Sequence, residues 1–230
     1  MTTCPNTVQR VSDYEAPPNL KKLPFAKWAS RIVGWTVLIL IWEFSSGTLV
    51  NSYYFGKPSG ILELVLEWSS TGYLWENLYA TLYTTIFAFI IASVSGVLFA
   101  LLVASNPILD RIFSPYILAA FSLPKITLAP ALVVWLGIGF LPQLTLGVLT
   151  SFFMVFYNSY SGLRNVNPAL LNTVAIIGAG RWETAFKVRL PAAAPFLAEG
   201  LRQGLIYAFH GTVVGEMTAS NLGIGYVLIF

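Results

Sequence analysis

Few side chains in this sequence could perform chemistry, and those few do not form a recognisable catalytic or metal-binding set. The 230 residues include one histidine, His210, and one cysteine, Cys4, which excludes a paired Cys/His metal site and an internal disulfide. No serine stands in a hydrolase motif, and no P-loop is present. We therefore predict that the chain is not an enzyme, that it holds no metal or cofactor, and that it binds neither nucleic acid nor ATP through these motifs.

The charged residues that remain informative lie inside apolar stretches. Lys125 follows Pro124 in such a stretch, and Glu43 lies inside another, near its far end. An ionisable residue within a membrane segment is by default a candidate functional residue. Lys125 either attracts an anionic solute into a pathway or satisfies carbonyls freed by Pro124, and we leave both open. For Glu43, which lies close enough to a segment end to reach the interface, we favour a structural role.

A second group of polar residues lies on one apolar block near the end of the sequence. Glu199 and Arg202 are three residues apart, so they share a helix face and can neutralise each other. The alternative is that the two contact a partner subunit or a gate. His210, on the same block, is either a hydrogen-bonded packing residue or a solute ligand, and we favour packing.

The composition identifies the elements that must position these residues as membrane helices. Hydrophobic residues make up 56% of the chain and charged residues 10%, whereas a soluble domain carries about 25% charged residues. Long apolar blocks predict an all-α, polytopic membrane helical bundle with about five spans and the start of a sixth. The predicted spans are 28–50, 78–104, 112–138, 144–160 and 192–214, and a further apolar run begins at 224.

A polar segment, residues 161–191, separates the last two predicted spans. Asn167 suits a helix N-cap and Pro168 the first helical position. Gly178 and Gly180 are expected to end this first short helix, because glycine tolerates the left-handed backbone found there.

A second short helix is predicted over 182–189, and Pro191 is expected to end it. Trp182 and Phe186 fall on one side of this helix, where they form either its core or anchors for another protein; we favour anchors. The segment is too polar for lipid and too apolar on one side for water, so it predicts a protein partner.

The distribution of cations predicts the orientation. Segment 1–31 has five Lys/Arg against two acids, segment 161–191 has four against one, and segment 51–77 has one against three. The positive-inside rule therefore places a tail of residues 1–27 and segment 161–191 in the cytoplasm. Four predicted spans lie between the two segments, and an even number of spans returns the chain to the same side of the membrane.

Segment 161–191 also resembles a known motif. Gly178, then nine residues, then Val188, one residue, Leu190 and Pro191 is similar to the cytoplasmic loop of permease subunits of binding-protein-dependent ABC importers, written E-A-A, three residues, G, nine residues, I-x-L-P. Asn172 stands where that family has its glutamate, so the carboxylate of the motif is missing. Stretches 123–130, 135–139, 200–202 and 216–217 also resemble the family.

The resemblance is strongest to the nitrate/sulfonate/taurine type, and it implies a MetI-like ABC type-1 transmembrane domain over residues 72–230. It implies translocation of a small anionic solute into the cell, through the inner or plasma membrane. The implied partners are an ATPase subunit, a second permease copy or sister subunit, and a periplasmic solute-binding protein. The implied ATPase-coupling residues are Asn172, Gly178, Trp182, Phe186, Val188, Leu190 and Pro191.

The family normally continues for another span beyond residue 230, so the domain looks truncated. This keeps a second hypothesis open, a non-transporting paralogue that only binds an ATPase or a sister permease. A third, an ion-coupled secondary transporter, would require internal repeats and midplane carboxylates, and the sequence has no convincing repeat.

Overall fold

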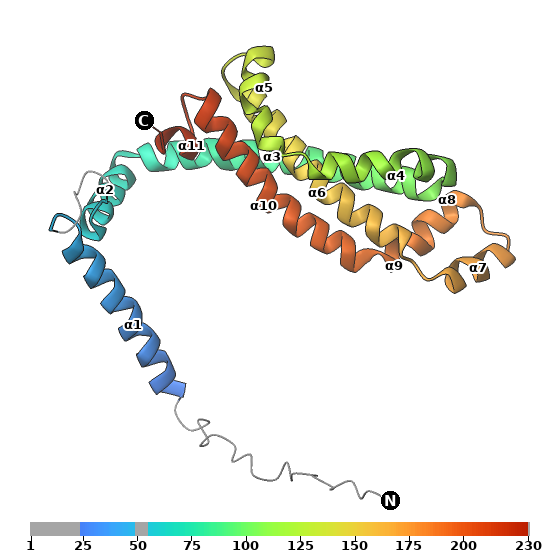
Figure 1. Ribbon diagram of the computed structural model, residues 1–230, viewed down its shortest axis with the longest axis horizontal. Coiled ribbons are helices and arrows are strands. Elements are labelled where there is room, and N and C mark those ends of the chain that lie inside the picture. The colour runs from blue at the N-terminus through green and yellow to red at the C-terminus, as the bar shows by residue number, and fades with distance from the viewer. Residues whose placement is uncertain (1–23, 49–54, 230) are drawn as a thin grey trace, which may run out of the picture. The chain divides into compact units, whose positions relative to one another are not determined.

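The computed structural model describes residues 24–48 and 55–229, and within them every regular element is helical. This confirms the predicted all-α class. The elements, drawn in Figure 1, are α1 (Pro24–Ser45), α2 (Pro58–Thr71), α3 (Tyr73–Ser105), α4 (Pro107–Ser122), η3 (Lys125–Leu128), α5 (Ala129–Leu136), α6 (Phe140–Arg164), α7 (Pro168–Ile176), α8 (Arg181–Thr184), η4 (Ala185–Arg189), α9 (Leu190–Ala192), α10 (Ala194–Ala219) and α11 (Ile224–Val227).

The chain divides into two compact units, the first ending at Glu67. Its helix α1 covers most of the predicted span 28–50, whose last two residues lie outside the described ranges. The Glu43 carboxylate accepts hydrogen bonds from the backbone N–H of Ser59, at 3.0 Å, and from its hydroxyl, at 2.7 Å. Because Ser59 lies in the first turn of α2, these bonds satisfy a helix N-terminus, which is the structural role expected of Glu43.

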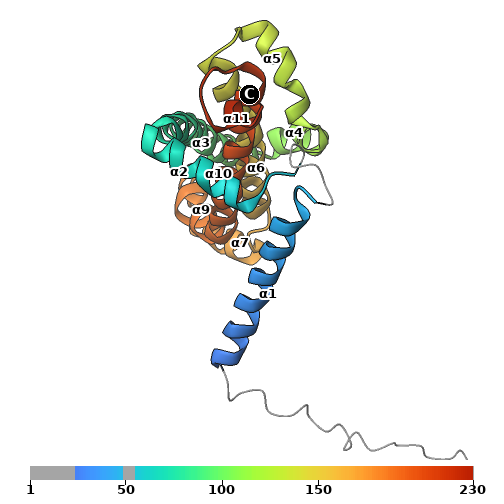
Figure 2. The same cartoon turned by 90° about the vertical axis from the view of Figure 1, so that its left-hand side faces the viewer.

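The second unit, residues 68–230, is built on three long helices, α3, α6 and α10. Figures 1 and 2 show these helices packed side by side. Small residues allow the close approach: Ala88, Ala92 and Ala100 of α3 are fully buried, and a Cβ atom on Gly96 would lie 3.2 Å from the Phe156 backbone nitrogen on α6.

The apolar block around residues 112–138 is broken into α4, η3 and α5. α4 begins earlier than predicted, at Pro107, because Asn106 caps it by accepting the Ile108 N–H at 3.0 Å. The chain bends by 80° between α4 and the segment 125–136, next to Pro124. This agrees with the predicted proline-interrupted block.

By length and hydropathy alone, two helices of the described ranges could cross a membrane, α3 and α6. A third is added if α4 and the bent segment 125–136 count as one broken span. Helices α1 and α10, with 22 and 26 residues, are long enough but are not in this set. Five spans therefore stay a prediction.

The two ends of the second unit are built from different elements. Figure 1 shows α7 and α8 at one end, and α5 and α11 at the other. Helix α6 runs toward the first end and α10 runs back from it, so residues 161–191 lie between the two helices as predicted. The end of α10 then carries a turn that leads into α11.

Candidate functional site

The first helix of segment 161–191 has the caps that its sequence predicts. The Asn167 side chain accepts the N–H of Ala169 at 2.9 Å, and Pro168 occupies the first turn of α7. Gly178 has φ 85°, and its N–H bonds to the Ala175 carbonyl at 3.0 Å while that of Ala179 reaches Val174 at 3.3 Å. This pair of bonds is a Schellman motif, so the predicted break at Gly178 is confirmed.

The second half differs from the prediction at Pro191. The chain forms α8, then a π-helical turn, η4, and then α9, which contains Pro191 instead of ending before it. In η4 the N–H of Leu190 bonds to Ala185 five residues back. The wider turn shifts the hydrogen-bond pattern just before a residue that cannot donate, so the helical path passes through the proline and continues toward α10.

The aromatic residues of the segment are on its surface. The rings of Trp182 and Phe186 stack with centroids 6.2 Å apart, and the two side chains are 61% and 49% exposed. Ile176 and Ile177, at the end of α7, are 86% and 78% exposed. We call these four side chains the loop surface. A short segment that leaves them uncovered has the composition of a docking site for another protein.

Four further residues of the motif lie nearer to the bundle or stay in solvent. Leu190 packs against the buried core of α3, α4 and α6, and Val188 is partly buried. Asn172 and Pro191 are exposed. The structure therefore places Leu190 as the attachment of the segment to the bundle, whereas the predicted coupling roles of the others stay predictions.

An arginine ties the segment to the end of α3. The Arg189 guanidinium donates a hydrogen bond to the carbonyl of Ala104, in a helix whose last turn has no cation of its own. A positive charge at a helix C-terminus is favourable. A cavity of about 230 Å³ beside this contact is lined by Ser105, Leu171, Ala175, Ala179, Thr184 and Arg189.

An exposed ion pair also lies on the second half of the segment. Lys187 and Glu183 are 2.5 Å apart, one helical turn from each other. The hydrogen bond from Lys187 and its charge hold the pKa of Glu183 below its ordinary value.

A polar network at the end of α6 was not foreseen from the sequence. The Tyr160 hydroxyl donates to the Asp110 carboxylate, and Arg164 donates to the Tyr160 oxygen at 3.1 Å and the Ser114 hydroxyl at 3.4 Å. These contacts join α4 to the point where segment 161–191 begins. No sequence signal could have paired residues 50 positions apart.

The other predicted residues lie on the bundle and not with the segment. Lys125 donates to the Phe121 carbonyl at 2.6 Å, and its ammonium lies 4.9 Å from the Phe153 ring centre. It lines a cavity of about 390 Å³ together with Thr150, Tyr207 and five other residues of the α4–η3 region and α6. The carbonyl bond supports the structural alternative, and the cavity keeps the solute alternative open.

The remaining predicted residues lie on α10. Glu199 and Arg202 form the expected pair, at 3.4 Å, on an exposed face. His210 is also exposed and meets the edge of Tyr207, with ring centroids 6.4 Å apart. Tyr207 thus lies between His210 and the Lys125 cavity, but the structure does not bring Lys125 and Glu199 together in one site.

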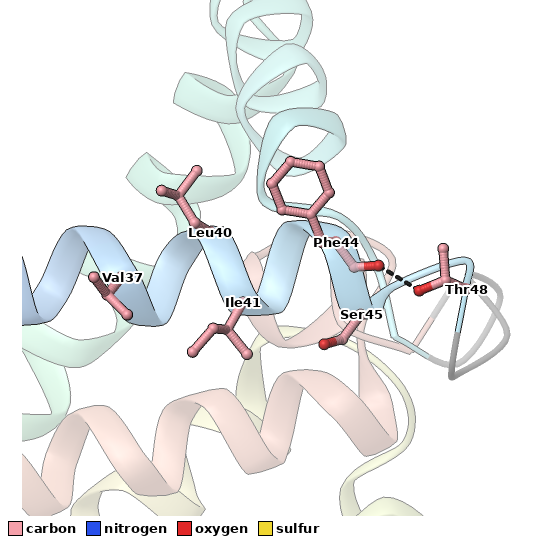
Figure 3. Close-up of a pocket in the computed structure, with 6 residues that line it drawn as sticks. All are labelled: Val37, Leu40, Ile41, Phe44, Ser45 and Thr48. Atoms are coloured by element: carbon pink, nitrogen blue, oxygen red, sulfur yellow. Dashed lines mark hydrogen bonds between the residues drawn. The ribbon is translucent and has the colours of Figure 1, made fainter.

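The first unit has a hollow of its own on α1. It measures about 520 Å³ and is lined by Val37, Leu40, Ile41, Phe44, Ser45 and Thr48, as Figure 3 shows. The Thr48 hydroxyl donates to the Phe44 carbonyl, and no charged side chain takes part. Such an apolar surface suits lipid or another helix and offers no chemistry.

Comparison with known proteins identifies the family. The family described as "Binding-protein-dependent transport system inner membrane component" matches residues 92–229. A probable ABC transporter permease protein of Haemophilus influenzae is 31% identical over 200 residues, which are 86% of this chain and 80% of that protein. The riboflavin transport system permease protein RibX of Chloroflexus aurantiacus is 28% identical over 92% of this chain and 80% of its own length.

The taurine transport system permease protein TauC of Escherichia coli is 25% identical over 89% of this chain and 77% of its own length. These relatives are permease subunits and not enzymes, which agrees with the resemblance carried by Gly178, Val188, Leu190 and Pro191. The chain belongs to the family of inner-membrane permease components of binding-protein-dependent ABC importers.

Proposed function

We propose that this permease moves a small anionic solute into the cell and is driven by a separate ATPase subunit that binds residues 161–191. The family accounts for the coarser part of this function, an importer permease of the inner membrane that works with an ATPase and a solute-binding protein. The docking residues, the solute class and the arrangement of subunits are the proposed part.

The observation that carries the proposal is the loop surface. Two stacked rings and two isoleucines project from a segment that is fixed to the bundle by Arg189 and Leu190. Exposed aromatic and aliphatic anchors on a rigid support are typical of binding hot spots, because little conformational entropy is lost when they are covered. We assign the ATPase contact to Trp182 and Phe186.

The remaining motif residues hold this surface in place. Gly178 sets the turn between α7 and α8, and Leu190 and Pro191 carry the chain into α10. Val188 and Asn172 are assigned to the edges of the contact. Because Asn172 is exposed and carries no charge, its contribution is smaller than that of a glutamate in the same place.

Support for an anionic solute comes from Lys125. Its ammonium is at the wall of the 390 Å³ cavity, whose lining also offers the Thr150 and Tyr207 side chains. The names of relatives include taurine and aliphatic sulfonates, and also riboflavin and formylaminopyrimidine. The family thus serves several solute types, and Lys125 is the feature of this chain that favours an anion.

The proposed arrangement has residues 1–27 in the cytoplasm, a first span over 28–50 and the ABC type-1 domain over 72–230. A second copy of the chain, or a sister permease, completes the transporter. The charge distribution supports the orientation, because segments 1–31 and 161–191 are both cationic. Most of the first of these segments lies outside the described residues.

The proposal is tested by purifying the chain in mild detergent with the ATPase of its own transport system, and then reconstituting both with the binding protein. We expect the two subunits in about a one-to-one ratio and ATP hydrolysis that rises with the solute-loaded binding protein. A chain that returns without the ATPase would contradict the proposal. Stable ATPase binding without transport would favour the second hypothesis, a non-transporting paralogue.

The solute class is tested separately with taurine and riboflavin as probes. We expect Lys125→Gln to lower taurine uptake and to leave uptake of riboflavin, where it occurs, unchanged. Arg111→Gln, which removes an exposed cation of α4 that has no assigned role, is the matched control. Equal effects of the two variants on taurine would exclude a specific role for Lys125.

A further inference from the structure

The end of the bundle away from segment 161–191 contains a buried carboxylate that the proposed function does not use. Glu216 is 1% exposed, the only acidic side chain so deeply buried in the described ranges. It lies near the end of α10, 22 residues after the start of that helix, a distance of about 33 Å along its axis.

The backbone after α10 is bound to side chains from two helices. The N–H groups of three consecutive residues donate in turn: Gly223 to the Asn77 amide oxygen at 2.8 Å, Ile224 to the Thr81 hydroxyl at 2.8 Å, and Gly225 to the Glu216 carboxylate at 2.9 Å. Thr81 also donates to the same carboxylate oxygen at 2.9 Å. We call these three side chains, together with the turn 220–225 that carries the three N–H groups, the Glu216 latch.

Two glycines let the turn rest directly on the carboxylate. Gly223 has φ 112°, and a Cβ atom there would lie 2.3 Å from the carboxyl carbon of Glu216. A Cβ atom on Gly225 would lie 2.2 Å from the Val213 carbonyl. The turn is therefore shaped to cover Glu216, and no larger residue fits at either position.

The latch also has an unfavourable contribution to its free energy. One carboxylate oxygen of Glu216 has no hydrogen-bond partner, and no Lys, Arg or His of the described residues forms an ion pair with it. A buried acidic group without a cation is costly, and opening the turn would return it to water. The hydrogen-bond donors favour the closed turn, whereas the cost of burying the carboxylate favours the released turn. A contact with these opposing contributions is suited to alternate between the two states.

We propose that the Glu216 latch holds the turn 220–225 against α3 in one state of the transport cycle and releases it in the other. The inference rests on the proposed function. The turn also forms a wall, through Ser220, Asn221 and Leu222, of a 290 Å³ cavity with α3 and the start of α6, so its release opens that cavity.

Helix α10 connects the latch to the ATPase contact. It begins shortly after α9 and segment 161–191, and it carries Glu216 in its last turn, just before the turn 220–225. A displacement of the loop surface by the ATPase therefore moves the same rigid helix that carries the latch carboxylate. Asn77 and Thr81 stay on α3, so a small shift between α3 and α10 is enough to break the hydrogen bonds.

The test uses spin labels on either side of the latch in the complete transporter. Tyr79→Cys on α3 and Leu222→Cys in the turn are exposed positions next to the latch residues, and Cys4→Ser removes the native thiol. We expect one short distance in the resting complex and a second, longer one when ATP is trapped. Glu216→Ala should raise the longer population about tenfold without nucleotide, because two hydrogen bonds to a buried carboxyl are lost.

Matched variants separate the latch from general damage. Glu216→Gln keeps an acceptor for the Gly225 N–H, so its population with the longer distance should lie between that of the parent and that of Glu216→Ala. Thr218→Ala removes an exposed hydroxyl that is bonded only within α10, so its distribution of distances should match that of the parent. If Glu216→Ala does not assemble, Thr81→Val provides the same measurement, since it removes the hydroxyl shared by Ile224 and Glu216.

A single distance in all nucleotide states, or equal distributions for Glu216→Ala and Thr218→Ala, would overturn the inference. A label at Ile176 in the loop surface distinguishes this result from failure of the proposed function. If that label responds to the ATPase while the latch pair does not, only the latch is wrong. If it does not respond, the proposed function fails and the inference fails with it.

Discussion

The two ends of the second unit differ in which type of residue they expose and which they bury. At the loop surface, Trp182 and Phe186 are apolar and exposed, and the segment is held by a hydrogen bond from Arg189 and by the packing of Leu190. At the Glu216 latch, a polar group is buried and held by several hydrogen bonds from two helices. The first end leaves apolar area uncovered for a partner, whereas the second encloses its own polar groups.

The difference predicts what a substitution at each end would change. An exposed apolar patch gains free energy only when another protein covers it, so its function depends on a partner. A buried polar cluster is complete without a partner, and it is destabilised when any one member is removed. Substitutions at the two ends should therefore separate ATPase binding from movement of the turn 220–225.

The largest effect is expected from removing the rings of the loop surface. Trp182→Ala and Phe186→Ala should each weaken ATPase association about 30-fold, the change produced by ~2 kcal/mol at a binding hot spot. Titration of the ATPase onto detergent-solubilised chain measures this affinity. Trp135→Ala, at an exposed aromatic of α5, is the control, and an equal loss there would show that the effect is not specific to the loop surface.

The second effect comes from the turn between α7 and α8. Gly178→Val places a β-branched residue at φ 85°, which should cost ~1–2 kcal/mol and weaken ATPase association roughly tenfold without changing membrane insertion. Gly180→Ala is the matched control, because that glycine has no positive φ and open space around its Cβ position. An unchanged affinity in Gly178→Val would show that ATPase association does not depend on this turn.

A smaller effect is expected where the segment meets α3. Arg189→Ala should free the Ala104 carbonyl and speed amide exchange at the end of α3 about fivefold, the change produced by ~1 kcal/mol. Arg189→Lys should retain part of the protection, and Lys187→Ala should retain all of it. Equal exchange in the Ala variants of residues 187 and 189 would contradict the anchoring role.

The smallest effect concerns the exposed pair of Lys187 and Glu183. Because the folded-state pKa of Glu183 is lowered, the pair contributes above the ordinary glutamate pKa, and the contribution disappears as the pH falls through the lowered value. Protection factors of the amides over 184–190, which are corrected for the intrinsic pH dependence of exchange, should fall in that window, and Glu183→Gln should remove this fall. A fall in protection that persists in Glu183→Gln would assign it to another group.

The sequence predicted the local features of the loop end and missed the distant ones. Asn167 and Gly178 were recognisable because a cap or a left-handed turn is decided by neighbouring residues. Pro191 was misread because the π-helical turn at 185–189 has no reliable local signal. The resemblance marked 216–217 as a family stretch, but the partner of Glu216 on α3 is 135 residues away.

The helix bounds show the same distinction. The apolar blocks predicted α3 and α6 within a few residues, whereas α4 begins before its predicted block because Asn106 and Pro107 form a cap. Which cavity Lys125 lines and which ring His210 meets could not be predicted from local sequence. Their surroundings come from α6 and α10, whose packing is a property of the whole bundle.

A photo-crosslinking amino acid at position 182 shows whether the ATPase covers Trp182 and Phe186. In membranes that contain the complete transport system, we predict that this residue crosslinks to the ATPase subunit and that the same residue at position 135 does not. Crosslinking of position 182 only to lipid or to other permease chains would contradict the claim.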